Sequence, residues 1–124
     1  MKDNIKRDFI KNRKLVIEIR YNPNPRILDE RGTLINKLID SNVIPNAHWE
    51  LGGANITISD KLEQNQSRKK VFIDINRLSF ISSAGDTNES FYAGFEKAFK
   101  SFKETIPQIQ IQRIGCRIQG TYIS

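Results

Sequence analysis

The sequence predicts an α+β domain: an antiparallel sheet with two helices packed on one face, in a ferredoxin-like or related βα(ββ)αβ order. Several short segments alternate apolar and polar residues, which is typical of half-buried strands. Two longer segments repeat apolar residues at helical spacing, and turn-forming residues separate the segments. At 124 residues the chain is long enough to bury one core.

The first strand and the first helix are predicted on either side of a proline turn. Residues 15–21 alternate so that the apolar side chains share one face, and Pro23 ends the strand because proline offers no amide to a ladder. Asn24 is a suitable N-cap and Pro25 a suitable first helical residue. We therefore expect a helix from Pro25 to about Ser41.

The middle of the chain predicts further strands. Residues 49–58 are expected to form two short strands joined by a two-residue Gly-Gly turn, because glycine adopts positive φ freely. Residues 71–75 and 78–81 alternate in the same way, with a turn expected at Asn76-Arg77.

The last third predicts a helix and a closing strand. Asp86, followed by Glu89 three residues later, resembles a capping box, so the second helix is expected over residues 87–104. Its phenylalanines fall on one stripe, which indicates a core face more than a binding face. Residues 109–122 are expected to form a strand that bends near Gly115.

The positive charge is uneven along the chain. The formal net charge is +6, and residues 1–20 hold seven basic and three acidic side chains. We therefore divide the chain into a basic N-terminal arm, residues 1–13, and a single α+β domain, residues 14–124. A second basic run lies at Arg68-Lys69-Lys70. A surplus of this sign favours acidic partners.

The composition also excludes several classes of protein. No stretch approaches the roughly 20 apolar residues of a membrane span, and the first residues are charged throughout, so we expect a cytoplasmic protein without a membrane partner. Cys116 is the only cysteine and His48 the only histidine. One chain therefore cannot build an internal disulfide, a thiolate metal cluster or a histidine pair.

Four segments together resemble a sporadically distributed family of bacterial proteins of uncharacterised activity. They are a strand that ends in Glu18-Ile19-Arg20, the meander at residues 77–80, the phenylalanine-rich helix at residues 91–102 and the Tyr-containing strand at residues 117–122. The resemblance covers most of residues 14–122 and supports the predicted fold. It implies no activity, cofactor or catalytic residue.

Candidate chemical sites are few. Glu18, Glu50 and Asp74 lie on predicted strands and could converge as a metal or acid–base site, or could form ordinary surface ion pairs. A Cys116–His48 dyad is formally possible, and the loop at residues 82–87 precedes a helix start, where amides can bind phosphate. Because plainer structural roles explain each, the sequence predicts no catalytic residue, no metal ligand and no cofactor, and an enzyme that uses Glu18, Glu50 and Asp74 is kept only as the last functional alternative.

We therefore predict a non-catalytic binding protein, and nucleic acid is the partner that the basic residues favour most. An RNA-recognition module would need stacking aromatics on its first and third strands, which are missing, so contact with the phosphate backbone is expected. The predicted contacts are Lys2, Lys6, Arg7, Lys11, Arg13, Lys14, Arg68, Lys69 and Lys70.

The main alternative is a protein-interaction module. It would self-associate, or serve as an accessory subunit or inhibitor of a larger bacterial assembly such as a defence-related one, through an exposed sheet edge or the region of Tyr21 and Trp49.

Overall fold

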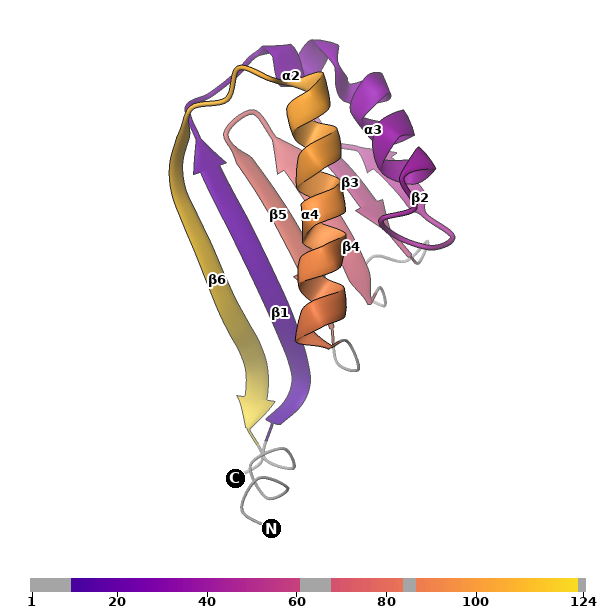
Figure 1. The fold of residues 1–124 in the computed structure, drawn as a ribbon, viewed down its shortest axis with the longest axis vertical. Coiled ribbons are helices and arrows are strands. Elements are labelled where there is room, and N and C mark those ends of the chain that lie inside the picture. The colour runs from indigo at the N-terminus through magenta and orange to yellow at the C-terminus, as the bar shows by residue number, and fades with distance from the viewer. Residues whose placement is uncertain (1–9, 61–67, 84–86, 123–124) are drawn as a thin grey trace.

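A computed structural model describes the backbone of residues 10–60, 68–83 and 87–122, and the side chains of residues 14–60, 68–83 and 87–117. The described residues form a six-stranded sheet and three helices (Figure 1). In chain order they are β1 (Ile10–Tyr21), α2 (Arg26–Asp29), α3 (Arg31–Asp40), β2 (His48–Leu51), β3 (Ile56–Ser59), β4 (Lys69–Asp74), β5 (Arg77–Ser82), α4 (Asn88–Thr105) and β6 (Ile111–Tyr122).

The strand order confirms the predicted topology. The sheet runs β2-β3-β4-β5-β1-β6, and each neighbouring pair is antiparallel. β1 and β4 are therefore parallel to each other with β5 between them, which is the split βαβ arrangement of ferredoxin-like folds. The hairpin of β2 and β3 extends the sheet beyond β4. The predicted α+β class, with its antiparallel sheet, is thus correct.

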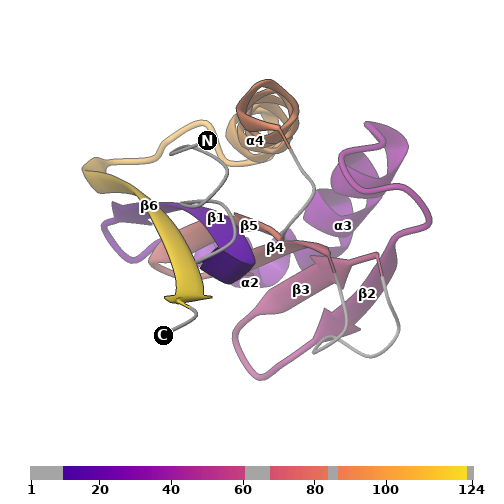
Figure 2. The same cartoon turned by 90° about the horizontal axis from the view of Figure 1, so that it is seen from below.

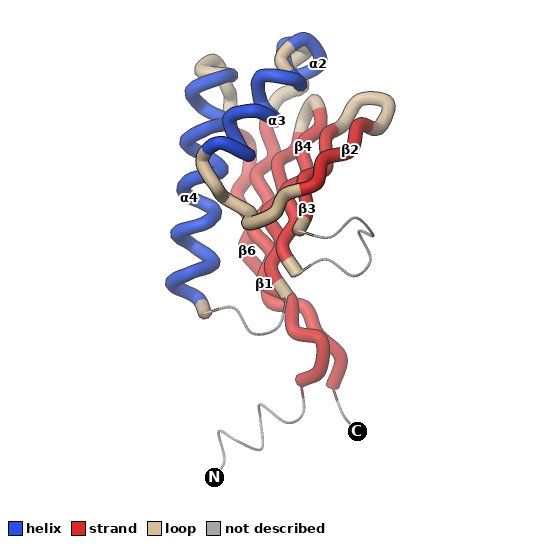
Figure 3. The backbone as a smooth tube through the Cα atoms, turned by 90° about the vertical axis from the view of Figure 1, so that its right-hand side faces the viewer, coloured by secondary structure: helices blue, strands red, loops and turns tan. Residues whose placement is uncertain are grey.

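α3 and α4 lie on one face of the sheet and α2 lies beyond one end of the strands, so neither of the two longer described helices covers the other face (Figures 2 and 3). The core fills the space between the sheet and the helix layer. Every second residue of β1 from Leu15 to Tyr21 points into it, together with Phe80 of β5 and Phe91 and Phe102 of α4. The phenylalanine stripe of α4 is therefore core, as its helical spacing predicts.

The connections differ from the sequence prediction at several points. The first helix is interrupted at Glu30, whose φ of −102° and ψ of 14° are not helical. The β2–β3 loop has four residues, 52–55, because Leu51 pairs with Ile56 and the Gly52 amide donates to the Asn55 carbonyl. The two-residue Gly-Gly turn was therefore wrong. The β4–β5 turn is likewise at residues 75–76, since Asp74 pairs with Arg77.

The cap of α4 is Thr87, one residue after the predicted Asp86. The Thr87 hydroxyl accepts the Ser90 amide hydrogen at 3.0 Å, as N-cap side chains do. Asp86 lies outside the described residues. At the first helix, Asn24 does accept the Arg26 amide hydrogen with its side chain, at 3.0 Å, but the helix starts one residue later than predicted.

The two long strands pair almost without interruption. β1 begins at Ile10, five residues before the expected start, so part of the predicted arm belongs to the sheet. The pairing of β1 with β6 continues through Gly115, and the register shifts lie elsewhere, between Lys11 and Lys14 and between Arg20 and Tyr21. Gly115, where a bend was predicted, therefore causes no register shift. Among the described residues, no helix combines the length and apolarity that crossing a membrane requires.

Candidate nucleic-acid interface

The face of the sheet away from the helices, which we call the open face, carries most of the strand charges. Because residues directly opposite in antiparallel strands share a face, the register fixes its members. One row across it consists of Glu50, Thr57, Phe72, Ser79, Glu18 and Gly115. Thr57 and Ser79 are only 8% and 7% exposed, so longer side chains enclose the short ones in the middle of the sheet.

The neighbouring row contains three arginines side by side. Asp74 of β4 pairs with Arg77 of β5, which pairs with Arg20 of β1, which in turn pairs with Arg113 of β6. Cβ atoms of directly opposite residues lie about 5 Å apart, so like charges at this spacing repel one another. This arrangement needs either neighbouring carboxylates or a bound anion to offset the repulsion.

Glu18 supplies part of that compensation. Its carboxylate lies 3.3 Å from Arg20 Nε and 3.7 Å from Arg77 Nη1, and it accepts a hydrogen bond from the Ser79 hydroxyl at 3.3 Å. The Glu18 side chain is only 14% exposed, so both of its oxygens are taken up by these neighbours. Glu18 therefore offsets part of the positive charge of Arg20 and Arg77.

Arg77 connects this cluster to β4. Its Nη2 lies 3.7 Å from Asp74 Oδ2, and its guanidinium lies 4.8 Å above the centre of the Phe72 ring. The Nε atom of Arg77 is buried and has no hydrogen-bond partner among the described residues. Asp74 also accepts the Asn76 amide hydrogen at 3.0 Å, which fixes the tight turn before Arg77.

Lys14, which follows the basic arm, lies at the same end of the sheet as the second basic run. Ser82 of β5 pairs with Leu15 on one side and with Lys69 on the other, and the Ser83 amide donates to the Arg68 carbonyl at 2.7 Å. Lys14 and Arg68 therefore flank the end of β5, two strand spacings or about 10 Å apart. Both side chains are exposed.

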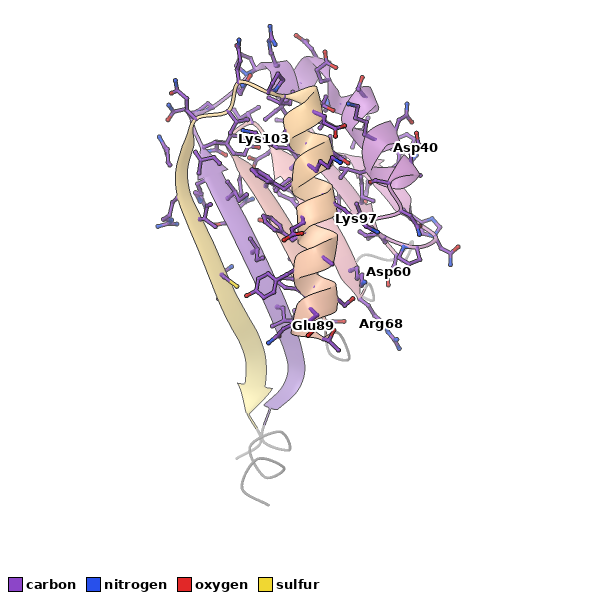
Figure 4. All side chains as sticks on the ribbon, viewed as in Figure 1. Asp40, Asp60, Arg68, Glu89, Lys97 and Lys103 are labelled. Carbon is purple, nitrogen blue, oxygen red and sulfur yellow. The ribbon has the colours of Figure 1, made fainter. Side chains whose placement is uncertain are left out.

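The link between β3 and β4 fixes Arg68 in this position. The Asp60 carboxylate accepts the amide hydrogens of Arg68 and Lys69, at 2.8 and 3.2 Å. Figure 4 labels Asp60 and Arg68 near each other at this end of the sheet. Lys97 and Lys103 belong to α4, which packs on the other face from the open face.

The predicted contact residues are thus placed in part. Lys14, Arg68 and Lys70 come together on the open face or at its end, whereas Lys69 shares a side with the core residue Val71. The backbone of Lys11 and Arg13 belongs to β1, but their side chains are not described. The remaining predicted contacts lie outside the described residues: Lys2, Lys6 and Arg7.

Sequence reasoning missed the arginines of the last strand. Arg113 and Arg117 of β6 lie opposite Arg20 and Val16, on the open face. Their spacing of four along a strand was the available signal, because it puts both on one side. Which side that is, and that β6 lies next to β1, followed only from the strand pairing.

The alternative catalytic sites do not assemble. Glu50 lies on β2, four strands from Glu18, so the three carboxylates do not converge. His48 and Cys116 are on opposite edge strands. Within the described part of the chain, no three His, Cys, Asp or Glu side chains form a group that could hold a metal ion.

Cys116 has a different neighbour, Tyr92 of α4. The Tyr92 hydroxyl and the Cys116 sulfur lie 3.4 Å apart, and this hydrogen bond raises the pKa of the Tyr92 phenol. The loop at residues 82–87, considered for phosphate binding, is described only at its ends. The Ser90 amide in the first turn of α4 already donates its hydrogen to the Thr87 hydroxyl.

A shallow pocket of about 410 Å³ lies between α3 and α4. Lysines and carboxylates line it together, and Lys37 is paired with Glu104 at 3.6 Å. Its three lysines and two carboxylates leave it with little excess charge of either sign.

Comparisons with known proteins complete the description. No protein-family model matches the chain, and no curated protein matches it. Among solved structures, it is similar to the crystal structure of the adenosylmethionine decarboxylase from Aquifex aeolicus VF5. The TM-score is 0.46 and the sequence identity 10%, over 91% of this chain and 92% of that one. The resemblance to the bacterial family stays a prediction.

Proposed function

We propose that this chain is a non-catalytic, cytosolic binding protein that holds the phosphate backbone of a nucleic acid against the open face of its sheet. The observation that carries the proposal is that Lys14, Arg68 and Lys70 come together on a face that also holds Arg113 and Arg117. The strands bring together cations that are far apart in sequence.

The chemistry of the open face suits a polyanion and not a base. Phe72 is the aromatic side chain on the described strands of this face, and Arg77 covers its ring at 4.8 Å, so base stacking has no exposed platform there. Lysine and arginine side chains on a sheet can instead neutralise successive phosphates. Binding of this kind releases counterions and therefore weakens steeply as salt rises.

The test measures the salt dependence of binding to a fluorescently labelled oligonucleotide, by anisotropy. In the variant Lys14→Gln, Arg68→Gln, Lys70→Gln, three cations are removed from the proposed site. The slope of log K against log salt is expected to fall by about two to three, because each lost phosphate contact removes about 0.7 to 0.9 from it.

A matched variant separates the open face from net charge alone. Lys97→Gln, Lys100→Gln, Lys103→Gln removes the same charge from α4, where all three side chains are exposed. It is expected to keep most of the salt slope. Equal losses in the two variants, or no binding by the unmodified chain at low salt, would refute the proposal.

A further inference from the structure

The two edges of the sheet are built very differently. β2 has four residues, whereas β6 has twelve. A long edge strand presents a row of unpaired backbone groups, which native proteins usually shorten, cover or interrupt. β6 contains no proline and carries exposed apolar side chains: Ile111 is 42% exposed and Ile114 is 62% exposed.

The exposed apolar residues of β6 lie on the helix side of the sheet. Ile114 pairs with Ile19 and Cys116 with Ile17, both of which are core residues. α4 lies over β1 and β5 and leaves β6 uncovered (Figures 1 and 2). Tyr92, which is 46% exposed, is the α4 residue that reaches toward β6, through its contact with Cys116.

Backbone hydrogen bonds show which residues of β6 face outward. The Tyr21 amide donates to Asn76, on the β5 side, and the Asn22 amide donates to Gln110, on the β6 side. Because backbone groups alternate along a strand, the even-numbered residues of β1 bond to β6. The partners of these residues on β6 are Arg113, Gly115 and Arg117, whose backbone amide and carbonyl groups therefore point toward β1. Ile114 and Cys116 consequently present their amide and carbonyl groups at the free edge.

These constraints leave few ways for β6 to pair with another copy of itself. Only residues whose backbone groups face outward can form hydrogen bonds with the second copy. In a two-fold symmetric antiparallel pair, outward-facing residues of one copy must therefore lie opposite outward-facing residues of the other. A register that places Ile114 opposite Cys116 also places Arg113 opposite Arg117, where like charges repel. A register centred on Ile114 avoids that repulsion but overlaps only residues 111–117.

We propose that two copies of this chain pair antiparallel along β6 in the register centred on Cys116. Arg117 then lies opposite Gly115, Arg113 opposite position 119, and Ile114 opposite position 118. This register overlaps residues 111–121 of β6, the longest overlap that keeps every arginine away from another arginine directly across the pair. A second copy brings the same exposed apolar side chains to the helix side of the pair, and this register offsets its arginines from those of the first copy.

The pairing makes one continuous sheet with both helix layers on the same side. It covers Ile114 and Cys116 from both copies on that side. On the open face, Arg113 and Arg117 of the two copies become diagonal neighbours, about 7 to 8 Å apart. Their repulsion is screened by salt, so the pairing strengthens as ionic strength rises, opposite to nucleic-acid binding.

The first test is the mass of the full chain in solution, by sedimentation velocity at low and moderate salt, followed by oxidation with diamide. Residues directly opposite in a bonded antiparallel pair have Cα atoms about 5.5 Å apart, within the range that a disulfide spans. In the register centred on Ile114, the two Cys116 residues would be about 13 Å apart along the strands. A Cys116 disulfide dimer is therefore expected only from the proposed register.

The second test uses a matched pair of exposed apolar residues at the two edges. Ile114→Lys adds two charges to the proposed interface, whereas Trp49→Lys places the same charge on β2, where Trp49 is 56% exposed. Ile114→Lys is expected to weaken association by more than about tenfold and Trp49→Lys to leave it unchanged.

The outcomes are decisive in both directions. A monomer mass at every concentration and salt, with no diamide-linked dimer, would overturn the proposal. A dimer that Trp49→Lys disrupts and Ile114→Lys does not would assign the interface to β2 and overturn it equally. Failure of the proposed nucleic-acid function would leave this result untouched, because no nucleic acid is present in either test.

Discussion

Tyr21 shows, at the scale of one residue, how the end of the long strand β1 is fixed. Its ring packs 5.5 Å from the ring of Phe102, and its hydroxyl donates to the Asp74 carbonyl at 2.6 Å. The side chain is 1% exposed. The prediction that Tyr21 contributes to a partner-binding surface was therefore wrong. Trp49, named with it, is exposed on the edge strand β2.

The buried phenol of Tyr21 makes folding sensitive to alkaline pH. Burial, and then the Asp74 carboxylate, raise the pKa of Tyr21 above its ordinary value of 10.0. The folded chain keeps a proton that the unfolded chain releases above about pH 10, so the free energy of unfolding falls as pH rises through that range. The variant Tyr21→Phe is expected to lose about 1 kcal/mol at neutral pH and to show a smaller alkaline decline.

Urea denaturation of both proteins at a series of pH values measures the two effects. Tyr92→Phe is the control, since Tyr92 is on the surface of α4 and its replacement is expected to change the free energy of unfolding at neutral pH by less than about 0.5 kcal/mol. Because the hydrogen bond with Cys116 also raises the pKa of Tyr92, this variant is expected to reduce the alkaline decline, but by less than Tyr21→Phe does. An identical alkaline decline in Tyr21→Phe and the unmodified chain would show that Tyr21 does not carry the dependence.

At the scale of one element, α4 is held close to the sheet by a glycine. A Cβ atom at Gly94 would lie 2.9 Å from Cζ of Phe80. Phe80 is 1% exposed and its ring is in contact with Phe91 and Phe95, at centroid distances of 5.3 and 6.5 Å. The ring has no room to move aside, so the absence of a side chain at Gly94 sets the helix–sheet distance.

Two glycine replacements separate this packing from helix propensity. Alanine is favoured over glycine inside a helix by about 1 kcal/mol, and Gly32 of α3 has no atom within 4 Å of an added Cβ. Gly32→Ala is therefore expected to raise the free energy of unfolding by up to about 1 kcal/mol. Gly94→Ala is expected to lower it by about 1 kcal/mol, because overpacking costs more than propensity gains. Thermal and urea unfolding measure both, and stabilisation by Gly94→Ala would contradict the packing argument.

Local pattern accounted for most elements but not for their ends. The alternation of residues 15–21 and the phenylalanine spacing of α4 each correspond to a real strand or helix. The two-residue turn at Gly52 was wrong because a glycine pair permits a tight hairpin without requiring one. The break at Glu30 carries no sequence signal that we can identify. The length of the loop after β2 follows from the pairing of Leu51 with Ile56, which the local pattern does not contain.

At the scale of the whole molecule, strand order decides the candidate site. Arg20, Arg77 and Arg113 are neighbours only because β1 lies between β5 and β6. No local pattern predicts that order, since each strand alternates in the same way and could pair with any other. The βα(ββ)αβ order expected from element type was sufficient to predict the fold class, and insufficient to predict which charges meet.

The first residues of the chain and the open face are two sets of cations that could contact the same nucleic acid. Lys2, Lys6 and Arg7 precede β1, which enters the sheet at the end where Lys14 and Arg68 lie. If both sets contact one polyanion, the variant Lys2→Gln, Lys6→Gln, Arg7→Gln lowers the salt slope of binding by about two to three. Combining it with the Lys14, Arg68 and Lys70 replacements lowers the slope by the sum of the two effects.

The measurement is the same anisotropy titration, with the α4 lysine variant as the control of equal charge. If both sets of cations contact one polyanion, their losses in slope add. Each removed cation leaves one phosphate with its counterion still bound, so one fewer counterion is released on binding. If the replacements at Lys2, Lys6 and Arg7 alone abolished binding while those on the open face had no effect, the first residues would be the sole contact. The arginine row would then be a structural ion-pair network, held together by Glu18 and Asp74.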